Sequence, residues 1–503
     1  MEQAASERVD LRLVPAALTG WAVTAAGIGW GVGAALAAVC AAVGGGWTVL
    51  RRFAGQRYPV LRAASAAVLG AAAVGAGLGL AVALRSDAVA HHPLRAAVGS
   101  TVWVTVIPTE HPRPVAGGRL LFRADLTDDG GRVVVFAPSS GYAELTAGRP
   151  ARFRARITVP RRRDLTVAAL SATGRPVLGD ASALQRAAAG VRARFATAAR
   201  EALPADQAAL LPGLVLGDTS TVAPATTADF KTVGLTHLTA VSGANVTIVC
   251  GTVLLIAAVV GPRVAVVLAA LVLAGFVVVV TPGASVLRAA VMGAISLLAV
   301  LSARRRQAIP ILAATVLALL LLAPQLAVDA GFALSVSATA ALVVLAPLWS
   351  ARLVGRGWPK PLADAVAIAV AAQLVTAPMI AAISGRLSLV SVVANLLVAV
   401  VIPPITVLGT AAAALCPALP GLAGLLIRFT GPELWWLLAV ARRAAALPGA
   451  AVGVPSGWAG LAVVGAAAVA AATLWRRRWF RLAAAGATVC LLAWSVSGLV
   501  VGS

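Results

Sequence analysis

The chain has 503 residues, of which 60% are hydrophobic and only 12% are charged. A soluble domain carries about 25% charged residues, so this composition excludes an ordinary soluble protein and indicates an integral membrane protein. The net charge is +23, and all of the basic residues except Lys231 and Lys360 are arginine. Arginine stays charged and binds phosphate oxygens through two N–H groups, although an arginine-rich genome would produce the same excess.

Apolar stretches of spanning length recur along the chain on both sides of a long polar stretch at about 86–205. They lie at 13–30, 31–50, 59–84, 238–261, 264–281, 284–303, 308–325, 329–349, 362–384, 387–415, 421–441, 456–475 and 482–502. We predict a polytopic α-helical membrane protein with about 11–13 spans. The segment 416–447 carries charged residues and two tryptophans, so it is either one crossing or an amphipathic helix in the interface.

The short loops between these stretches indicate how the chain is oriented, because basic residues gather on the cytoplasmic side. The basic residues that fall on one side, if 416–447 crosses once, are Arg51, Arg52, Arg57, Arg263, Arg304, Arg305, Arg306, Arg352, Arg356, Lys360, Arg476, Arg477, Arg478 and Arg481. We therefore expect a multi-pass protein of the cell membrane with residues 86–235 outside. The first apolar run is expected to be a retained anchor.

The polar stretch contains short β-rich segments separated by Gly, Pro and Asp. They lie at 101–107, 119–126, 131–138, 152–159 and 165–172. Five strands at this spacing are typical of a small β-barrel such as an OB-fold. We therefore expect an inserted, extracytoplasmic OB-like domain.

The fourth of these segments, RFRARITV, places three arginines on one face because side chains alternate along a strand. The DNA-binding candidates are these and the three arginines just beyond: Arg152, Arg154, Arg156, Arg161, Arg162 and Arg163. Such a face suits a nucleic-acid backbone. The alternative is an ordinary solvated strand face.

Together these patterns divide the chain into five parts. They are N-terminal transmembrane helices at 1–85, the OB-like β domain at 86–185, a helical connector at 186–235, a transmembrane domain at 236–415, and amphipathic and transmembrane helices at 416–503.

The stretch GLTHLTAVSGANVTIVCG (234–251) brings polar residues into an apolar run. On a helix, His237 and Asn245 share one face, and Ser242 flanks it. Polar groups inside a membrane are costly and usually face a bundle interior or an aqueous cavity. Gly243 permits close helix approach or a break. The alternative is a structural hydrogen bond between helices.

Five sequence blocks in chain order resemble the ComEC-type competence proteins. They are LLPGLVLGDTS (210–220), DFKTVGLTHLTAVSGANVTIV (229–249), SVLRAAVMG (285–293), VDAGFALSVSATAAL (328–342) and AQLVTAPMIAAISGRLSLVSVVANLLVAVVIPP (372–404). Asn245 stands where a histidine is common in that family. The leading apolar runs, the β domain and the trailing runs also match the family's layout.

The resemblance implies a channel through which single-stranded DNA enters the cell during natural transformation. The channel-lining candidates are His237, Ser242, Gly243, Asn245, Arg288, Asp329, Ser335, Gln373 and Asn395. Arg288 needs a partner or a phosphate, and Asp329 is the candidate partner, either as part of the path or as a structural salt bridge. We also expect Pro403 and Pro404 to kink the helix that holds Asn395.

The implied partners are single-stranded DNA, the lipid bilayer, a separate DNA receptor, a cytoplasmic ATPase or helicase, and a nuclease. Many members of the family carry a C-terminal metallo-β-lactamase-like domain, and its metal-binding histidine cluster is absent here. The four histidines, which lack its spacing, are His91, His92, His111 and His237.

We expect no metal, no cofactor and no enzymatic activity, and the sequence has no phosphate-binding GxxxxGK[ST] loop. The four cysteines lie far apart in apolar runs and are expected to pack: Cys40, Cys250, Cys416 and Cys490. Two alternative functions stay open. One is transport of another anionic or lipid-linked substrate, and the weaker one is an intramembrane hydrolase that uses His237 and Ser242.

Overall fold

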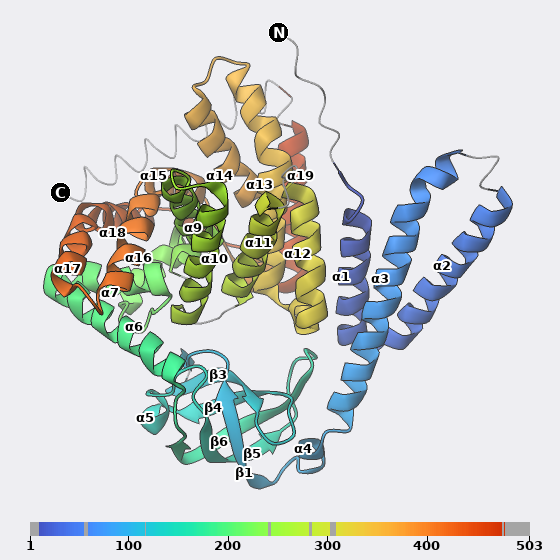
Figure 1. Ribbon diagram of the computed structural model, residues 1–503, viewed down its shortest axis with the longest axis horizontal. Coiled ribbons are helices and arrows are strands. Elements are labelled where there is room, and N and C mark those ends of the chain that lie inside the picture. The colour runs from blue at the N-terminus through green and yellow to red at the C-terminus, as the bar shows by residue number, and fades with distance from the viewer. Residues whose placement is uncertain are drawn as a thin grey trace. The chain divides into compact units, whose positions relative to one another are not determined.

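The computed structural model describes residues 10–54, 59–115, 117–239, 243–280, 284–301, 308–474 and 477 (Figure 1). The expected span at 482–502 and the candidate Ser242 lie outside the described residues. The chain divides into two compact units, each assembled from two stretches. The first is Met1–Arg194 with Ser242–Ala333, and the second is Phe195–Val241 with Leu334–Ser503.

The first unit combines apolar helices with a small sheet domain. Its helices are α1 (Val14–Trp30), α2 (Gly33–Ala54), α3 (Pro59–Ala90), α4 (Pro93–Ala96), α5 (Ser139–Tyr142), α9 (Gly243–Ala257), α10 (Pro262–Val279), α11 (Ala284–Leu301), α12 (Ala308–Leu322) and the 3₁₀ turn η2 (Pro324–Val328). Small residues let these helices approach closely. A methyl group at Gly33 of α2 would come within 2.9 Å of the Gly79 carbonyl oxygen on α3.

Two further helices continue from one unit into the other: α6 (Ala183–Ala202) and α13 (Ala330–Val354). The remaining helices of the second unit are α7 (Ala205–Leu216), α8 (Pro224–Thr232), the 3₁₀ turn η1 (Thr236–Leu238), α14 (Lys360–Ser384), α15 (Ser391–Ala399), α16 (Ile402–Leu415), α17 (Pro420–Phe429), α18 (Gly431–Ala445) and α19 (Gly457–Leu474). Two short strands, β7 (Arg386–Ser388) and β8 (Ala451–Gly453), pair antiparallel. This pairing lies where α14 and α19 pack together around Ala381 and Val464.

Four helices in the described part of the chain are long and apolar enough to cross a membrane: Gly33–Phe53, Ser65–Ala90, Ala330–Val354 and Lys360–Ser384. A fifth crossing is formed if α15 and α16, which meet at a bend of 54°, count as one broken span. Other apolar helices, such as α9 and α12, are shorter. The larger number of spans expected from hydropathy therefore stays a prediction. The region 416–447 forms two short helices, α17 and α18, and not one long one.

The sheet domain of the first unit has six strands: β1 (Thr101–Pro108), β2 (Arg113–Val115), β3 (Arg119–Leu126), β4 (Arg132–Pro138), β5 (Ala151–Thr158) and β6 (Thr166–Leu178). The five predicted strands are confirmed, and the three-residue β2 was not predicted. The strand order is β1-β5-β6-β4-β3-β2, and β1 also pairs with β3. The sheet thus closes on itself. All pairings are antiparallel except β4 with β6.

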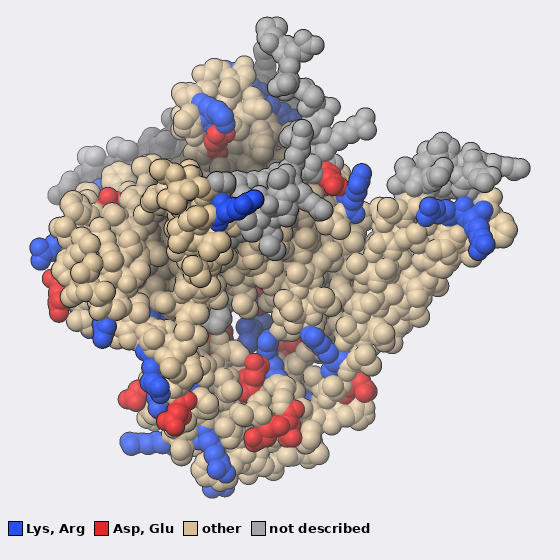
Figure 2. Space-filling model, viewed as in Figure 1, with Lys and Arg blue, Asp and Glu red and all other residues tan. Residues whose placement is uncertain are grey.

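Alternation along the strands builds the core of this domain. The inward residues of β5 are fully buried while its outward residues are exposed. Large buried side chains such as Phe122, Tyr142 and Phe153 fill the centre. Figure 2 shows the contrast with the helices, whose visible surface is nearly uncharged between their ends, while charged side chains gather over the sheet domain.

Candidate functional site

The glycine of the predicted GLTHL motif makes a tight turn in the second unit. Gly234 has a φ of +76°, a left-handed conformation that favours glycine. It lies two residues after the end of α8, and the next residue, Leu235, donates its N–H to the Phe230 carbonyl oxygen at 2.8 Å. A methyl group at Gly234 would come within 2.6 Å of the Ser391 hydroxyl oxygen. The motif therefore brings the turn before His237, an exposed residue of η1, against the start of α15.

Two of the predicted lining residues meet at this place through a serine. The Ser391 hydroxyl donates to Gln373 Oε1 on α14 at 3.0 Å. Asn395 Nδ2 donates to the Ser391 carbonyl oxygen at 2.8 Å and contacts the Ser391 hydroxyl at 3.3 Å. We call Gln373, Ser391 and Asn395 the polar cluster. It places three uncharged hydrogen-bonding side chains together among apolar helices.

Sequence reasoning did not single out Ser391, which is only 3% exposed. One local signal was available, because Ser391 and Asn395 are four residues apart and so lie on one helix face. The contact with Gln373 depends on how α14 and α15 pack, and no local pattern reports that.

The helix that carries Asn395 is broken one turn later. α15 ends at Ala399 and α16 begins at Ile402, with Pro403 and Pro404 in its first turn. Proline suits a first turn because the missing N–H is not needed there. The two helices meet at a bend of 54°, which confirms the predicted kink. At the break, the Val401 N–H bonds to the Val398 carbonyl oxygen at 3.1 Å, so the Leu397 carbonyl oxygen loses its helical partner.

Trp436 of α18 supplies the replacement. Its indole N–H donates to the Leu397 carbonyl oxygen at 2.8 Å. A backbone carbonyl without a partner is expensive in an apolar environment, so this contact stabilises the broken geometry. In the sequence, the tryptophans of this region indicate only a membrane interface, and no local pattern predicts the contact between Trp436 and Leu397.

The remaining lining candidates are divided between the two units. In the first, Gly243 and Asn245 lie in the first turn of α9, and Asn245 is 6% exposed. A methyl group at Gly243 would lie 3.6 Å from Ala289 Cβ. The start of α9 therefore packs on α11, the helix that carries Arg288. The side chain of Arg288 lies outside the description. Ser335 lies on α13 in the second unit.

Asp329 has a local role that sequence reasoning did not assign. Its Oδ1 accepts the Phe332 N–H at 2.8 Å, directly before α13. A carboxylate in this position caps the helix start and complements the helix dipole. Pairing of Asp329 with Arg288 stays a prediction.

The predicted arginines of β5 share one exposed face. Arg152, Arg154 and Arg156 all point outward. The Arg152 guanidinium lies 5.4 Å from the ring centroid of Trp103, which is 55% exposed on β1. Trp103 is the strand neighbour of Arg154. Sequence reasoning missed Trp103, although alternation in TVWVTVI places it outward with two threonines.

The other three predicted arginines lie in the loop between β5 and β6. Arg161, Arg162 and Arg163 are exposed. Arg163 Nη1 also lies 3.5 Å from the Gly29 carbonyl oxygen, near the end of α1.

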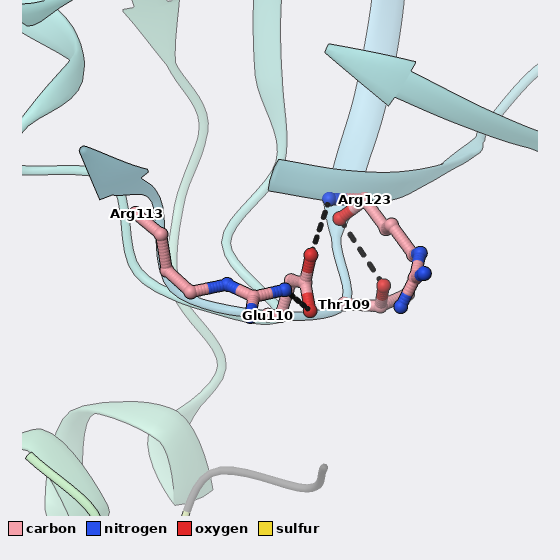
Figure 3. Close-up of polar contacts among 4 residues, drawn as sticks. All are labelled: Thr109, Glu110, Arg113 and Arg123. Carbon is pink, nitrogen blue, oxygen red and sulfur yellow. Dashed lines mark hydrogen bonds and ion pairs between the residues drawn. The ribbon is translucent and has the colours of Figure 1, made fainter. Parts of the chain in front are cut away.

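A second basic surface, not predicted, lies on β2, β3 and β4. Figure 3 shows how the loop before β2 is fastened to β3. Glu110 Oε2 pairs with Arg113 at 2.9 Å, while its Oε1 accepts the Arg123 N–H at 3.1 Å. The Thr109 hydroxyl donates to the Arg123 carbonyl oxygen at 3.1 Å. The loop that precedes Arg113, the first residue of β2, is therefore held against β3.

The described residues contain no group of three His, Cys, Asp or Glu side chains placed to hold a metal ion. His91 lies near Asp87 at 3.2 Å, and His92 Nε2 contacts the Gly130 carbonyl oxygen at 3.0 Å. The absence of a metal from the whole protein stays a prediction.

The model of a family described as competence protein matches residues 214–479, more than half of the chain. The matched segment includes Gly234, the polar cluster, the break between α15 and α16, and Trp436, but not the sheet domain. Comparison with curated proteins found no match. Comparison with solved structures found none either.

Proposed function

The chain belongs to the competence protein family, and on that premise we propose that it is a membrane channel that admits single-stranded DNA during natural transformation. Membership of this family indicates a part in DNA uptake. The finer proposal concerns what the protein does in uptake: it provides the path through the bilayer.

The observation that carries this proposal is the polar cluster beside a broken helix. A chain of phosphates cannot cross hydrocarbon, so its path needs hydrogen-bonding groups and irregular backbone within protein. Asn395 lies one turn before the break, and Ser391 and Gln373 bring two more uncharged groups to it from the start of α15 and from α14. Such groups bind a polyanion weakly enough to release it, whereas a row of arginines would hold it. Discontinuous helices are also the usual place of transport sites in membrane transporters.

We propose that the sheet domain is an OB-like barrel outside the cell. The closed strand order, the parallel pairing of β4 with β6 and the position of α5 between β4 and β5 support this. Its exposed arginines, Arg152, Arg154 and Arg156, would collect DNA electrostatically. The Arg-rich loops support the orientation and the larger number of spans.

The proposal assigns transport and no catalysis to this chain. A separate receptor, a cytoplasmic ATPase or helicase, and a nuclease would deliver, pull and trim the DNA. Deletion of the gene tests the proposal, with uptake of labelled linear DNA measured in the deletion strain and after complementation. We expect uptake to stop while DNA still binds the cell surface. Unchanged uptake in the deletion strain would refute the channel role.

A further inference from the structure

We propose that a pocket in the second unit binds the headgroup of phosphatidylethanolamine, a phospholipid that carries both an ammonium and a phosphate. The pocket lies between the first turn of α7 and one face of α18, and its volume is about 480 Å³. We call it the headgroup pocket, and its lining includes Asp206, Gln207, Trp435, Leu438, Ala439 and Arg442. None of these residues belongs to the polar cluster, so the inference does not depend on the proposed path of DNA.

An ion pair joins the two walls of the headgroup pocket. The Arg442 guanidinium of α18 donates to the Asp206 carboxylate of α7. Both side chains are more than half exposed, and an exposed pair of this kind contributes little to stability. A ligand that carries both charges can therefore separate the pair at little cost. Its phosphate accepts from the guanidinium, and its ammonium donates to the carboxylate.

The pocket also contains a hydrogen-bond acceptor that lacks a donor. Gln207 Oε1 is buried and has no hydrogen-bond partner among the described residues. It lies close to the start of α18, where a methyl group at Gly431 would come within 3.6 Å of it. A buried acceptor without a donor is costly. A primary ammonium has three N–H donors, enough for the Asp206 carboxylate and Gln207 Oε1 together.

These groups select among the common phospholipid headgroups. The quaternary ammonium of phosphatidylcholine has no N–H, so it leaves Gln207 Oε1 without a donor. Phosphatidylglycerol has hydroxyl donors but no positive charge, so its phosphate brings an unbalanced negative charge beside Asp206. A free phosphate has the same excess of negative charge. An ammonium with N–H groups joined to a phosphate matches both charges and the unpartnered acceptor.

The start of α7 favours the phosphate once the ammonium is bound. α7 begins at Ala205 after Pro204, and no side chain caps it. The N–H groups in the first turn of a helix have no intrahelical partner and carry partial positive charge. Asp206 lies in this turn and offsets that charge. When the ammonium neutralises the Asp206 carboxylate, the positive end of α7 attracts the phosphate.

The neighbouring helix α17 indicates that the pocket lies at the membrane surface. Three apolar side chains of α17 are exposed at helical spacing: Leu422, Leu425 and Phe429. Its other side, with Ala423 and Ile427, is buried. An exposed apolar stripe on a short helix suits the boundary between lipid headgroups and acyl chains. α18 follows α17 after a single residue, so the two helices lie at the same boundary.

The α18 side of the pocket supplies an apolar wall. Trp435 is exposed and lines the pocket together with Leu438 and Ala439. Tryptophan concentrates at the membrane–water interface, because its ring is apolar and its N–H is polar. The glycerol and the first acyl carbons of a lipid pack on this wall while the headgroup meets the charged residues. A water-soluble ligand would make no use of the wall.

The experiment measures lipid binding to the full-length protein, delipidated in detergent, by native mass spectrometry. The probes are phosphatidylethanolamine, phosphatidylcholine and phosphatidylglycerol with the same acyl chains. We expect the parent to bind one phosphatidylethanolamine about tenfold more tightly than either other lipid, the effect of one buried hydrogen bond to a charged group. Equal binding of the three lipids would overturn the inference. Inorganic phosphate is the fourth probe, and if it displaces phosphatidylethanolamine at equal concentration, the pocket binds a free anion and the inference is wrong.

Two variants test whether the preference arises in this pocket. Gln207→Leu removes the unpartnered oxygen, so phosphatidylethanolamine should bind as weakly as phosphatidylcholine, whose binding should not change. Arg442→Gln should weaken all three lipids, because each of them has a phosphate. The matched control is Arg443→Gln, since Arg443 is the exposed neighbour on α18 and does not line the pocket. If Gln207→Leu keeps the preference and Arg442→Gln binds lipid as Arg443→Gln does, the lipid binds elsewhere and the inference is wrong.

Discussion

Gly234 lies so close to Ser391 that a methyl group at position 234 would come within 2.6 Å of the serine hydroxyl oxygen. This contact joins the turn after α8 to the first residue of α15. It also explains why a glycine precedes the LTHL residues of the motif: the turn needs a positive φ and no side chain.

We predict that Gly234→Ala destabilises the protein by about 2 kcal/mol or more, from left-handed strain together with overpacking. The apparent melting temperature in detergent should fall by several degrees. Gly243→Ala is the matched control in the same motif, because a methyl group there meets Ala289 at an ordinary 3.6 Å. Equal melting temperatures for the two variants would show that the contact at Gly234 is not tight.

We predict that Trp436→Phe weakens the break between α15 and α16, because the Leu397 carbonyl oxygen loses its donor. A backbone carbonyl left without a partner in an apolar environment costs about 1–3 kcal/mol. Thermal unfolding in detergent measures the loss. The neighbouring Trp435 is 55% exposed, so Trp435→Phe should change stability little. A larger effect at Trp435 than at Trp436 would contradict the role assigned to this hydrogen bond.

Tyr142 predicts how the sheet domain responds to alkaline pH. Burial raises the pKa of Tyr142 to about 12. Above pH 10 an unfolded tyrosine loses its proton while folded Tyr142 keeps it, so stability falls as pH rises and levels off near pH 12. The loss approaches about 2–3 kcal/mol, since each pKa unit corresponds to somewhat more than about 1 kcal/mol.

The variant Tyr142→Phe should remove this loss. It should also be at least as stable at neutral pH, because the Tyr142 hydroxyl has no hydrogen-bond partner in the described part of the chain. Full-length parent and variant are unfolded across pH 9 to 12 and compared. Parent and variant share all of their other titratable groups, so the difference between their two curves reports Tyr142 alone. Parallel pH curves would contradict the prediction.

The sheet domain was more predictable than the polar cluster for a physical reason. Alternation is a local property, so RFRARITV alone placed Arg152, Arg154 and Arg156 on one exposed face. Trp436, by contrast, reaches Leu397 from 39 residues away along the chain. Hydropathy reports how apolar a segment is, but not which side chain will satisfy a carbonyl oxygen freed by a break.

Asp329 was predicted as a site residue, but its role at the start of α13 was not predicted. The Asp329 carboxylate caps α13 by accepting the Phe332 N–H, a role that its predicted pairing with Arg288 does not include. The signal was present, since an aspartate directly before an apolar helical run is a common cap.

The orientation of the chain gives a further prediction. A reporter fused after Ser86 should lie outside the cell, and one fused after Arg305 should lie in the cytoplasm, because short basic loops stay inside. The location of each fusion site is measured with two reporters, one active only outside the cell and the other active only in the cytoplasm. Both fusions reporting the same side would contradict the proposed topology and leave the sheet domain without its extracytoplasmic place.

The last prediction concerns DNA entry through the polar residues. Asn395→Leu removes the amide that bonds Ser391 and places a bulky apolar group one turn before the break. Because a phosphate chain needs polar groups along its path, we expect DNA entry to fall at least tenfold while protein level and surface DNA binding stay at the parent values. The variants Ser242→Leu and Asn245→Leu are expected to behave in the same way.

Val393→Leu is the matched control, because it replaces one apolar side chain with another on the same helix. Val393 is 60% exposed. This variant should take up labelled DNA at the parent rate. A structural role for Asn395 has a different signature, because it lowers protein level or melting temperature together with uptake. If the Asn395→Leu protein is present at the parent level, melts at the parent temperature and still admits DNA at the parent rate, the strand does not pass the polar cluster. The path must then lie along other helices, and the cluster serves only to hold α14 and α15 together.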